Sequence, residues 1–469
     1  MNSNSDRTIE EIAIELVRLS NIGDGHLQAP GTLSCLRDLE LHRDDPEIVE
    51  KLTAALERNG GSSLTPWYLP LAEMGLIPLA VMRQRAVGHG GFHSGALGRS
   101  AARLRWVYDC GASREAGIKR LESEIAILKG DGEKRTLDLL FLSHFDRDHV
   151  SGVGRLLAAL HVKTVIMPYL DDLQRLAILL EQHVLEDGQG TNGELEQLLA
   201  DPTKWFQARG VGQVVQIKPA RPGARPGIAE FGVGTGIEAP EGTGAIDLIF
   251  VDDRGTPATL PPASAVVETG CAWVATHQLR RAGDWCLLPY VTSATIEAQD
   301  ALRRAVAALF GVEGQSGSLI ERFQRKVGEA GFFQSVKQAY RDAHLGDANA
   351  VSMSLYAGPF RDAFWYSRRV LNAARKHHTA GPGWLLTGDA KLDQVSRRNE
   401  WLKFYEGVRG KVGALMLPHH GSAAGFHETI LEAARPDALL FACKHVADVA
   451  RPLCGPACKR DPVSGVIGV

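Results

Sequence analysis

Four side chains that can bind metal ions are crowded into six consecutive positions of this chain. His144, Asp146, Asp148 and His149 lie in the segment HFDRDH, which follows the apolar run LDLLFLS and precedes the helix-like run VGRLLAALH. Imidazole nitrogens and carboxylate oxygens are ligands for zinc, manganese and iron. Four such donors are too many for one tetrahedral structural site that also takes an outside ligand. The segment therefore predicts two neighbouring metal ions, one held by the first His–Asp pair and the other by the second Asp–His pair.

Further candidate ligands follow two later apolar runs. Asp389 stands directly after the run in WLLTGD, and His419 and His420 stand after the run in ALMLPHHGS. Two metal ions a few ångströms apart need a bridging carboxylate and further ligands, which these positions can supply. A buried carboxylate or imidazole at a strand end is costly unless it is paired or bound to a metal. The combination in chain order therefore favours a composite metal site over three unrelated polar strand ends.

The elements around the cluster predict how these side chains meet. The apolar run before HFDRDH is strand-like, the run after it is helical, and VKTVIMPY is a second strand, so the three form a βαβ unit. Such units place ligand-binding loops at the carboxyl ends of their strands. Strand patterns resume at NAVSMSLYAG, and the N-terminus is helical, with Thr8 and Glu11 as a capping box. We expect a helical accessory region at 1–75 and an α/β domain over 76–469, interrupted by an insertion or cap at about 170–345.

The composition argues against several classes of protein. The chain has 469 residues and a formal net charge of -3, with 44% hydrophobic residues, so it has no general basic surface for sequence-independent nucleic-acid binding. No apolar run approaches the roughly 18 residues of a membrane span, and we expect no secretory leader. The seven cysteines are scattered, which indicates a reduced, cytoplasmic chain. We interpret Cys443, Cys454 and Cys458 as incidental thiols rather than as a zinc knuckle.

Taken in order, the motifs resemble those of the metallo-β-lactamase superfamily of metal-dependent hydrolases: VYDCG with Asp109, then HFDRDH, LLTGD and HHGS. Within that superfamily they are most similar to the soluble domain of DNA-uptake (competence) channel proteins. AVGHGGFHSGAL matches the opening strand of that branch, and NAVSMSL, with Asn349 and Ser352, matches the segment before its TGD strand. The resemblance covers about 80–169 and 345–445, roughly half of the chain, and does not include the membrane channel.

The resemblance implies a fold and a ligand set. The fold would be a four-layer αββα sandwich with two divalent metal ions, zinc or manganese, at one edge between the sheets, bridged by Asp389. The implied ligands of one ion are Asp148, His149 and one of His419 and His420, and those of the other include His144 and Asp146. Asp146 replaces the usual histidine, which favours manganese there. The usual mid-chain histidine is not evident, with His277 as the candidate, so one site is expected to be partial.

The chemistry of the superfamily implies hydrolysis by a metal-activated water, with Asp146 or Asp148 accepting its proton and His420 as an alternative proton donor. We therefore predict a phosphodiesterase, specifically a nuclease that acts on DNA or RNA. The candidate phosphate contacts are Asn349, Ser352, Ser422 and Lys391. Two alternatives stay open. One is a hydrolase of a small ester, thioester, lactone or cyclic nucleotide, and the other is a catalytically degenerate module that binds a protein partner through the N-terminal helices or the insertion.

Overall fold

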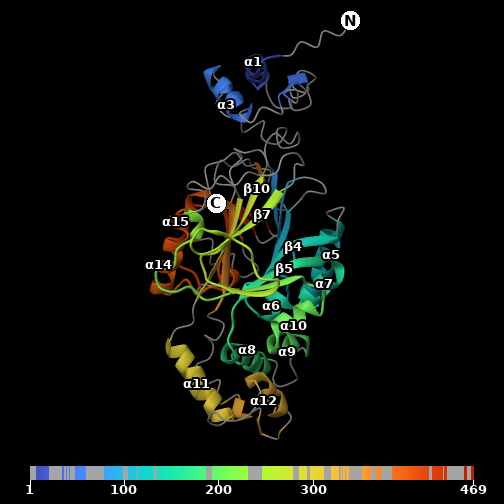
Figure 1. The fold of residues 1–469 in the computed structure, drawn as a ribbon, viewed down its shortest axis with the longest axis vertical. Coiled ribbons are helices and arrows are strands. Elements are labelled where there is room, and N and C mark those ends of the chain that lie inside the picture. The colour runs from blue at the N-terminus through green and yellow to red at the C-terminus, as the bar shows by residue number, and fades with distance from the viewer. Residues whose placement is uncertain are drawn as a thin grey trace.

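Two mixed β-sheets form the body of the molecule, with helices against them and further helices beyond both ends (Figure 1). The structure is a computed structural model, and it describes residues 7–20, 34–35, 38–39, 42, 48–59, 79–98, 104–113, 115–130, 135–185, 193–230, 246–277, 285–292, 296–310, 318–326, 329, 331–332, 334–336, 338, 351–360, 366–370, 383–421, 425–436, 438–440, 459–461 and 466–468. This architecture confirms the predicted α/β class.

The first sheet contains the strands around the HFDRDH segment, in the order β13-β1-β2-β3-β4-β5-β6-β9. These strands are β1 (Leu79–Gln84), β2 (His93–Leu97), β3 (Leu104–Tyr108), β4 (Thr136–Phe141), β5 (His161–Pro168), β6 (Gln213–Ile217), β9 (Ala263–Val267) and β13 (Tyr366–Val370). All pairings from β3 to β9 are parallel, and near-continuous apolar runs suit parallel strands that are covered on both faces. The predicted βαβ unit consists of β4, the helices α6 (Arg147–Val150) and α7 (Val153–Ala159), and β5.

The second sheet has the order β17-β18-β16-β15-β14-β12-β11-β10-β7-β8. Its strands are β7 (Ile246–Val251), β8 (Pro257–Ala258), β10 (Ala272–His277), β11 (Trp285–Val291), β12 (Met353–Pro359), β14 (Gly383–Leu386), β15 (Val412–Met416), β16 (Ala438–Leu440), β17 (Lys459–Asp461) and β18 (Val466–Gly468). Because β14, β15 and β16 are parallel, the TGD and PHHG segments leave this sheet at the same edge.

The two sheets face each other across the main core. The ring centroids of Trp106 on β3 and Trp285 on β11 are 6.4 Å apart, and those of Phe141 on β4 and Trp273 on β10 are 5.8 Å apart. Helices cover the outer face of each sheet (Figure 1). They are α5 (Glu115–Gly130), α7 and α10 (Pro202–Gln207) on the first sheet, and α14 (Val395–Phe404) and α15 (Thr429–Ala434) on the second. Short 3₁₀ turns are η4 (Gly227–Ala229), η6 (Arg409–Lys411) and η7 (His419–Gly421).

A helical lobe lies beyond one end of the sheets (Figure 1). It consists of α8 (Asp172–Leu185), α9 (Gly193–Ala200), α11 (Ile296–Phe310) and α12 (Leu319–Lys326). Apolar side chains of these amphipathic helices, among them Leu176, Leu309 and Phe323, are buried in one cluster. The chain enters the lobe from the ends of β5 and β11, which lie at the same edge as the end of β4.

The range 170–345, predicted as one insertion, is divided in the structure. Among the described residues of this range, the lobe helices extend beyond the two sheets, whereas β6 and β9 belong to the first sheet and β7, β8, β10 and β11 belong to the second. Apart from the strand-like run before His277, the sequence did not indicate these strands, because they are interleaved with Gly/Pro-rich segments such as ARPGARPGIAEFG. The sheet strands therefore continue through much of the predicted insertion.

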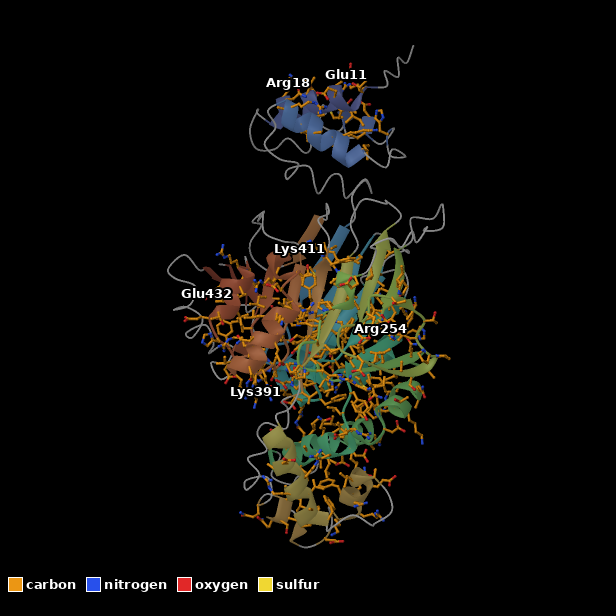
Figure 2. All side chains as sticks on the ribbon, turned by 60° about the vertical axis from the view of Figure 1, so that its left-hand side comes forward. Glu11, Arg18, Arg254, Lys391, Lys411 and Glu432 are labelled. Atoms are coloured by element: carbon orange, nitrogen blue, oxygen red, sulfur yellow. The ribbon has the colours of Figure 1, made fainter. Side chains whose placement is uncertain are left out.

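Two N-terminal helices, α1 (Ile9–Ser20) and α3 (Ile48–Arg58), pack against each other at the end of the sheets opposite to the lobe (Figures 1 and 2). The predicted capping box is confirmed: Thr8 N donates to Glu11 Oε2 at 2.7 Å, and Glu11 N donates to Thr8 Oγ1 at 3.3 Å. Within the described part of the chain, no helix is long and apolar enough to cross a lipid bilayer.

The burial of His93 on β2 leads us to expect that folding stability depends on pH. Its ring is buried beside Tyr108 and Trp384, at 6.1 and 6.5 Å between ring centroids. Burial lowers the pKa of His93 from 6.5 to about 4. Between these two values the unfolded chain binds a proton and the folded chain does not. The free energy of unfolding therefore falls as the pH drops from 6.5 toward 4, by about 3 kcal/mol in full.

The His93→Leu variant should lack this contribution, because leucine fills a similar volume without a titrating group. Urea unfolding at about pH 7.5 and about pH 5 measures it. We expect the stability loss between these two pH values to be about 2 kcal/mol smaller in the variant than in the wild type. An identical pH dependence in both proteins would show that His93 does not change its protonation on unfolding.

Candidate metal centre

The predicted ligands lie together at one edge of the two facing sheets. In the first sheet β4 ends at Phe141 before HFDRDH, and in the second sheet β14 and β15 end at Leu386 and Met416 before TGD and PHHG. The backbones of the two sheets are joined here, since Met353 N donates to Ser143 O at 2.8 Å. The strand ends that the sequence singled out therefore meet at one place.

One ligand group, named here the inner group, consists of His144, His149 and Asp389. Its donor atoms all lie within 4.8 Å of one another. Asp389 faces both rings: its Oδ2 lies 3.7 Å from His144 Nε2, and its Oδ1 lies 3.4 Å from His149 Nε2. Ligand atoms about 2.1 Å from a tetrahedral cation are roughly 3.4 Å from one another. These spacings therefore suit a divalent cation between the three side chains.

Buried atoms without partners in the inner group also fit a cation. The Nδ1 of the buried His144 lies 2.9 Å from Ser143 Oγ. Because Ser143 Oγ donates to Asp109 Oδ2 at 2.7 Å, it accepts from His144 Nδ1, which leaves a lone pair on His144 Nε2. That Nε2 and Asp389 Oδ1 are buried without a hydrogen-bond partner among the described residues. Such buried polar atoms are costly unless a cation or a proton satisfies them.

Asp109 orients this group from the end of β3. The fully buried carboxylate accepts hydrogen bonds from Ser143 N and Ser143 Oγ, both at 2.7 Å, and its Oδ2 lies 2.8 Å from His149 Nδ1. It therefore holds His149 with a proton on Nδ1 and turns Nε2, the nitrogen that can ligate, toward Asp389. The φ of Asp109 is 58°, a strained conformation that is typical of functional sites. In the sequence Asp109 stands out only through the VYDCG motif, and it was not predicted as a site residue.

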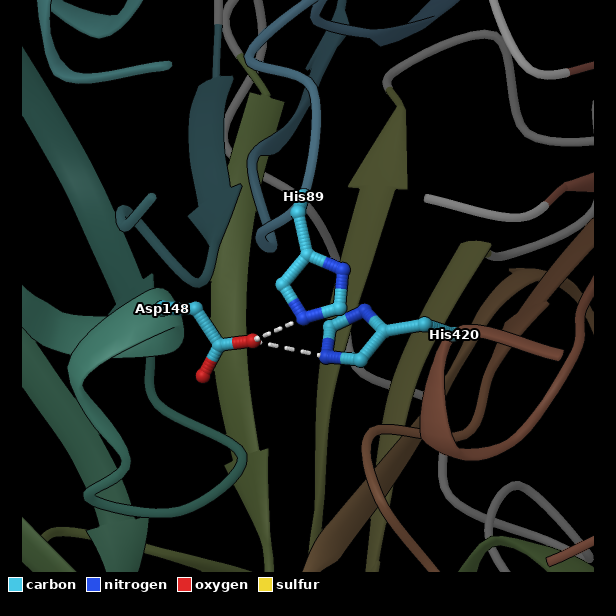
Figure 3. A group of neighbouring side chains, drawn as sticks. All are labelled: His89, Asp148 and His420. Atoms are coloured by element: carbon cyan, nitrogen blue, oxygen red, sulfur yellow. Dashed lines mark ion pairs between the residues drawn. The ribbon is translucent and has the colours of Figure 1, made fainter. Parts of the chain in front are cut away.

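A second group, named here the outer group, consists of His89, Asp148 and His420 (Figure 3). Asp148 Oδ2 lies 2.8 Å from His420 Nε2 and 3.5 Å from His89 Nε2. The two groups are adjacent, because His420 Nε2 lies 3.3 Å from His149 Nε2 and 3.9 Å from Asp389 Oδ1. His89 was not predicted from the sequence, where AVGHGGFHSGAL indicated only an opening strand and a turn.

Asp148 and His149 fall in different groups, whereas the sequence predicted one metal ion for this pair; Asp148 Oδ1 and His149 Nε2 are 4.0 Å apart, so the pairing stays a prediction. They are consecutive residues in α6, and consecutive side chains on a helix point about 100° apart. His149 contacts Asp109 at the end of β3, whereas Asp148 faces the loop between β1 and β2. Asp389 contacts the inner group and approaches His420, so it occupies the central position between the two groups.

The two adjacent histidines at the end of β15 are placed differently. His420 is buried, whereas the side chain of His419 is 48% exposed, with its Nε2 3.8 Å from Asp389 Oδ2. Both have left-handed backbones, with φ of 50° for His419 and 56° for His420, and His419 N donates to Gly388 O at 3.1 Å. Strain of this kind costs on the order of 1–3 kcal/mol per residue and is typical of functional sites. The structure therefore places His420 in the outer group and His419 at the rim.

Other predicted site residues surround the two groups. Asp146 is partly exposed, and its Oδ2 lies 3.6 Å from His144 Nε2. Ser352 is buried, and its Oγ accepts from Asp389 N at 3.1 Å, so it supports the Asp389 loop. Lys391 is half-buried and lies at the end of the sheets near the helical lobe (Figure 2). Among the predicted phosphate contacts that the structure describes, Lys391 is therefore the one at the rim.

Two of the predicted phosphate contacts, Asn349 and Ser422, lie outside the described residues, as do Cys443, Cys454 and Cys458. The candidate mid-chain ligand, His277, ends β10, where it pairs with Ile246 of β7. Because β10 is antiparallel to β11, and β11 runs toward the site, His277 lies at the opposite edge of the sheet. A strand-like run before a histidine does not reveal the direction of the strand, which is why the sequence was misleading here.

Neighbouring charges favour the ionised forms of Asp148, His149 and Asp389. Burial alone would raise the pKa of both Asp148 and Asp389, but the facing histidines outweigh burial and hold both values below the usual range. Burial alone would lower the pKa of His149, but Asp109, Asp148 and Asp389 raise it. A cation bound here would therefore displace protons, because imidazole ligates in its neutral form.

Sequence comparison does not assign the chain to a family. No protein-family model matches it, and no curated protein matches it significantly. The two facing sheets and the two ligand groups are therefore the basis for a functional conclusion.

Gly388 packs tightly between the strand ends, so we expect its substitution to destabilise the protein. Its φ is 55°, and an added Cβ would lie 2.6 Å from Ser352 Oγ and 2.8 Å from Ser143 Cβ. We expect Gly388→Ala to lower the free energy of unfolding by about 2–4 kcal/mol, because overpacking adds to the strain of a left-handed alanine. Urea denaturation measures the loss. Gly407→Ala is the matched control, since its Cβ would meet no neighbour, and equal stability of the two variants would contradict the tight contact.

Proposed function

We propose that this protein is a metal-dependent hydrolase of the metallo-β-lactamase type that acts as a phosphodiesterase on DNA or RNA. The observation that carries the proposal is the convergence of two His/Asp groups, with members from both sheets, at one sheet edge. The buried atoms without partners in the inner group support it. The facing sheets with helices on both outer faces support the αββα sandwich as the fold.

Two divalent cations, zinc or manganese, held by the inner and outer groups would supply an activated water and polarise the electrophile. The chain's own residues then have separate tasks. Ser143 and Asp109 hold the inner-group imidazoles in the tautomer that can ligate. The two candidate proton acceptors are Asp146, whose Oδ2 lies 3.6 Å from His144 Nε2, and Asp148, whose Oδ2 lies 2.8 Å from His420 Nε2. Lys391 at the rim can contact a phosphate oxygen.

Elemental analysis of the purified protein, together with cleavage assays on linear DNA and RNA in the presence of Zn²⁺ or Mn²⁺, tests the proposal. We expect close to two metal ions per chain, and cleavage that a chelator abolishes and added metal restores. Metal binding without cleavage of either polymer would favour a small-molecule hydrolase. Failure to bind any metal under every loading condition would overturn the proposal in favour of a protein-binding module.

A small-molecule hydrolase is the second candidate, and the position of the helical lobe favours it. The lobe is reached from the ends of β5 and β11, at the same sheet edge as the two ligand groups. Helices that extend from this edge can cover the metal centre, and a covered centre excludes polymers. Assays with a cyclic nucleotide and with an ester or lactone, run beside the DNA and RNA assays, decide between the two candidates.

A further inference from the structure

We infer that His89 is a direct ligand of the metal ion in the outer group. The inference rests on the proposed metal-dependent function and assigns a residue that no motif indicated. His89 Nε2 lies 3.5 Å from Asp148 Oδ2, close to the roughly 3.4 Å that separates the ligand atoms of a tetrahedral cation.

The loop between β1 and β2 is held in the position that this role requires. Gly91 N donates to Asp148 O at 2.9 Å, and Ser113 N donates to His89 O at 3.0 Å, so the loop is fixed at His89 and two residues after it. A Cβ on Gly91 would lie 2.8 Å from His149 Nδ1, so only glycine lets the loop approach the metal centre this closely. The backbone of His89 is therefore fixed relative to both ligand groups.

The side chain of His89 points toward the other two donors (Figure 3). Its ring lies on that of His420, with 4.5 Å between centroids. A simple surface ion pair with Asp148 would contribute little to stability, and His420 already contacts the same carboxylate oxygen at 2.8 Å. Three donors from three separate segments, namely the β1–β2 loop, α6 and η7, thus converge on one point.

The number of ligands supports the same assignment. Apart from Asp389, which lies between the two groups, the outer group without His89 would consist of Asp148 and His420, whereas catalytic zinc sites usually have three protein ligands. The second imidazole brings the outer group to that number. The third ligand of the outer group therefore comes from the N-terminal side of the HFDRDH segment.

Metal titration of His89→Ala tests this role without an activity assay. We expect the variant to retain one metal ion per chain and to bind the other at least on the order of a hundredfold more weakly, because loss of a supporting residue alone costs about 10–100-fold. His161→Ala, at the exposed start of β5, is the matched control and should bind both ions with wild-type affinity.

His89→Cys shows whether the side chain at this position touches the ion. In the Co²⁺-loaded protein we expect a thiolate-to-cobalt charge-transfer band in the near ultraviolet, absent from the wild type and from His161→Cys. No such band, with both ions bound at wild-type affinity in His89→Ala, would overturn the assignment of His89 and leave the metal-dependent function intact. A wild-type protein that binds no metal would overturn both.

Discussion

Replacing Asp389 with alanine is expected to abolish hydrolysis while leaving the fold largely intact. The carboxylate lies between the two ligand groups, within 3.4–3.9 Å of nitrogens of His144, His149 and His420. Its loss removes a ligand where charge must be stabilised, an effect worth several kcal/mol. We therefore expect kcat/KM to fall by at least on the order of a thousandfold. Hydrolysis by the metal-loaded protein, measured on the substrate that the wild type accepts, gives this ratio.

Asp393→Ala is the matched control for the Asp389 variant, because this side chain is exposed and lies four residues further on. It should keep wild-type activity, and circular dichroism should show the same fold in both variants. Wild-type activity in Asp389→Ala would show that the two-metal assignment is wrong. Loss of activity in both variants would point to damage of the loop after β14 rather than to loss of a ligand.

A second large effect is expected from Asp109→Ala. The change leaves three hydrogen-bonding groups, Ser143 N, Ser143 Oγ and His149 Nδ1, without their carboxylate partner. Each buried unsatisfied group costs about 1–3 kcal/mol, so we expect the free energy of unfolding to fall by roughly 3–5 kcal/mol. The metal affinity of the inner group should fall by about 10–100-fold, because His149 is no longer oriented. Urea denaturation of the metal-free protein and metal titration measure the two effects.

Asp109→Asn separates orientation from packing. Asparagine keeps the volume of the side chain and an oxygen for Ser143 N, but it turns an NH₂ group toward His149 Nδ1. We expect the imidazole to take the other tautomer, so that metal affinity falls as in the alanine variant while most of the stability is retained. Unchanged metal affinity in the asparagine variant would contradict the orienting role of Asp109.

Local features of the site could be predicted from the sequence, whereas features that depend on direction and register could not. An apolar run that stops at Asp389 or at the HFDRDH segment is a local signal, and so is the capping box of α1. The placement of Asp148 and His149 in different ligand groups depends on the direction in which each side chain points from α6. The position of His89 depends on how the β1–β2 loop contacts that helix, and no periodicity in the sequence reports such a contact.

Each ligand group has members from both sheets, and this has a consequence for the whole molecule. His89, Asp148 and His149 belong to the first sheet, and Asp389 and His420 to the second, so a bound ion would cross-link segments hundreds of residues apart in the chain. Affinity for the ion and the closeness of the two sheets are then linked equilibria. Changes in the Trp106–Trp285 contact, which involves no residue of either ligand group, should therefore alter metal affinity, and chelation should loosen the packing between the sheets.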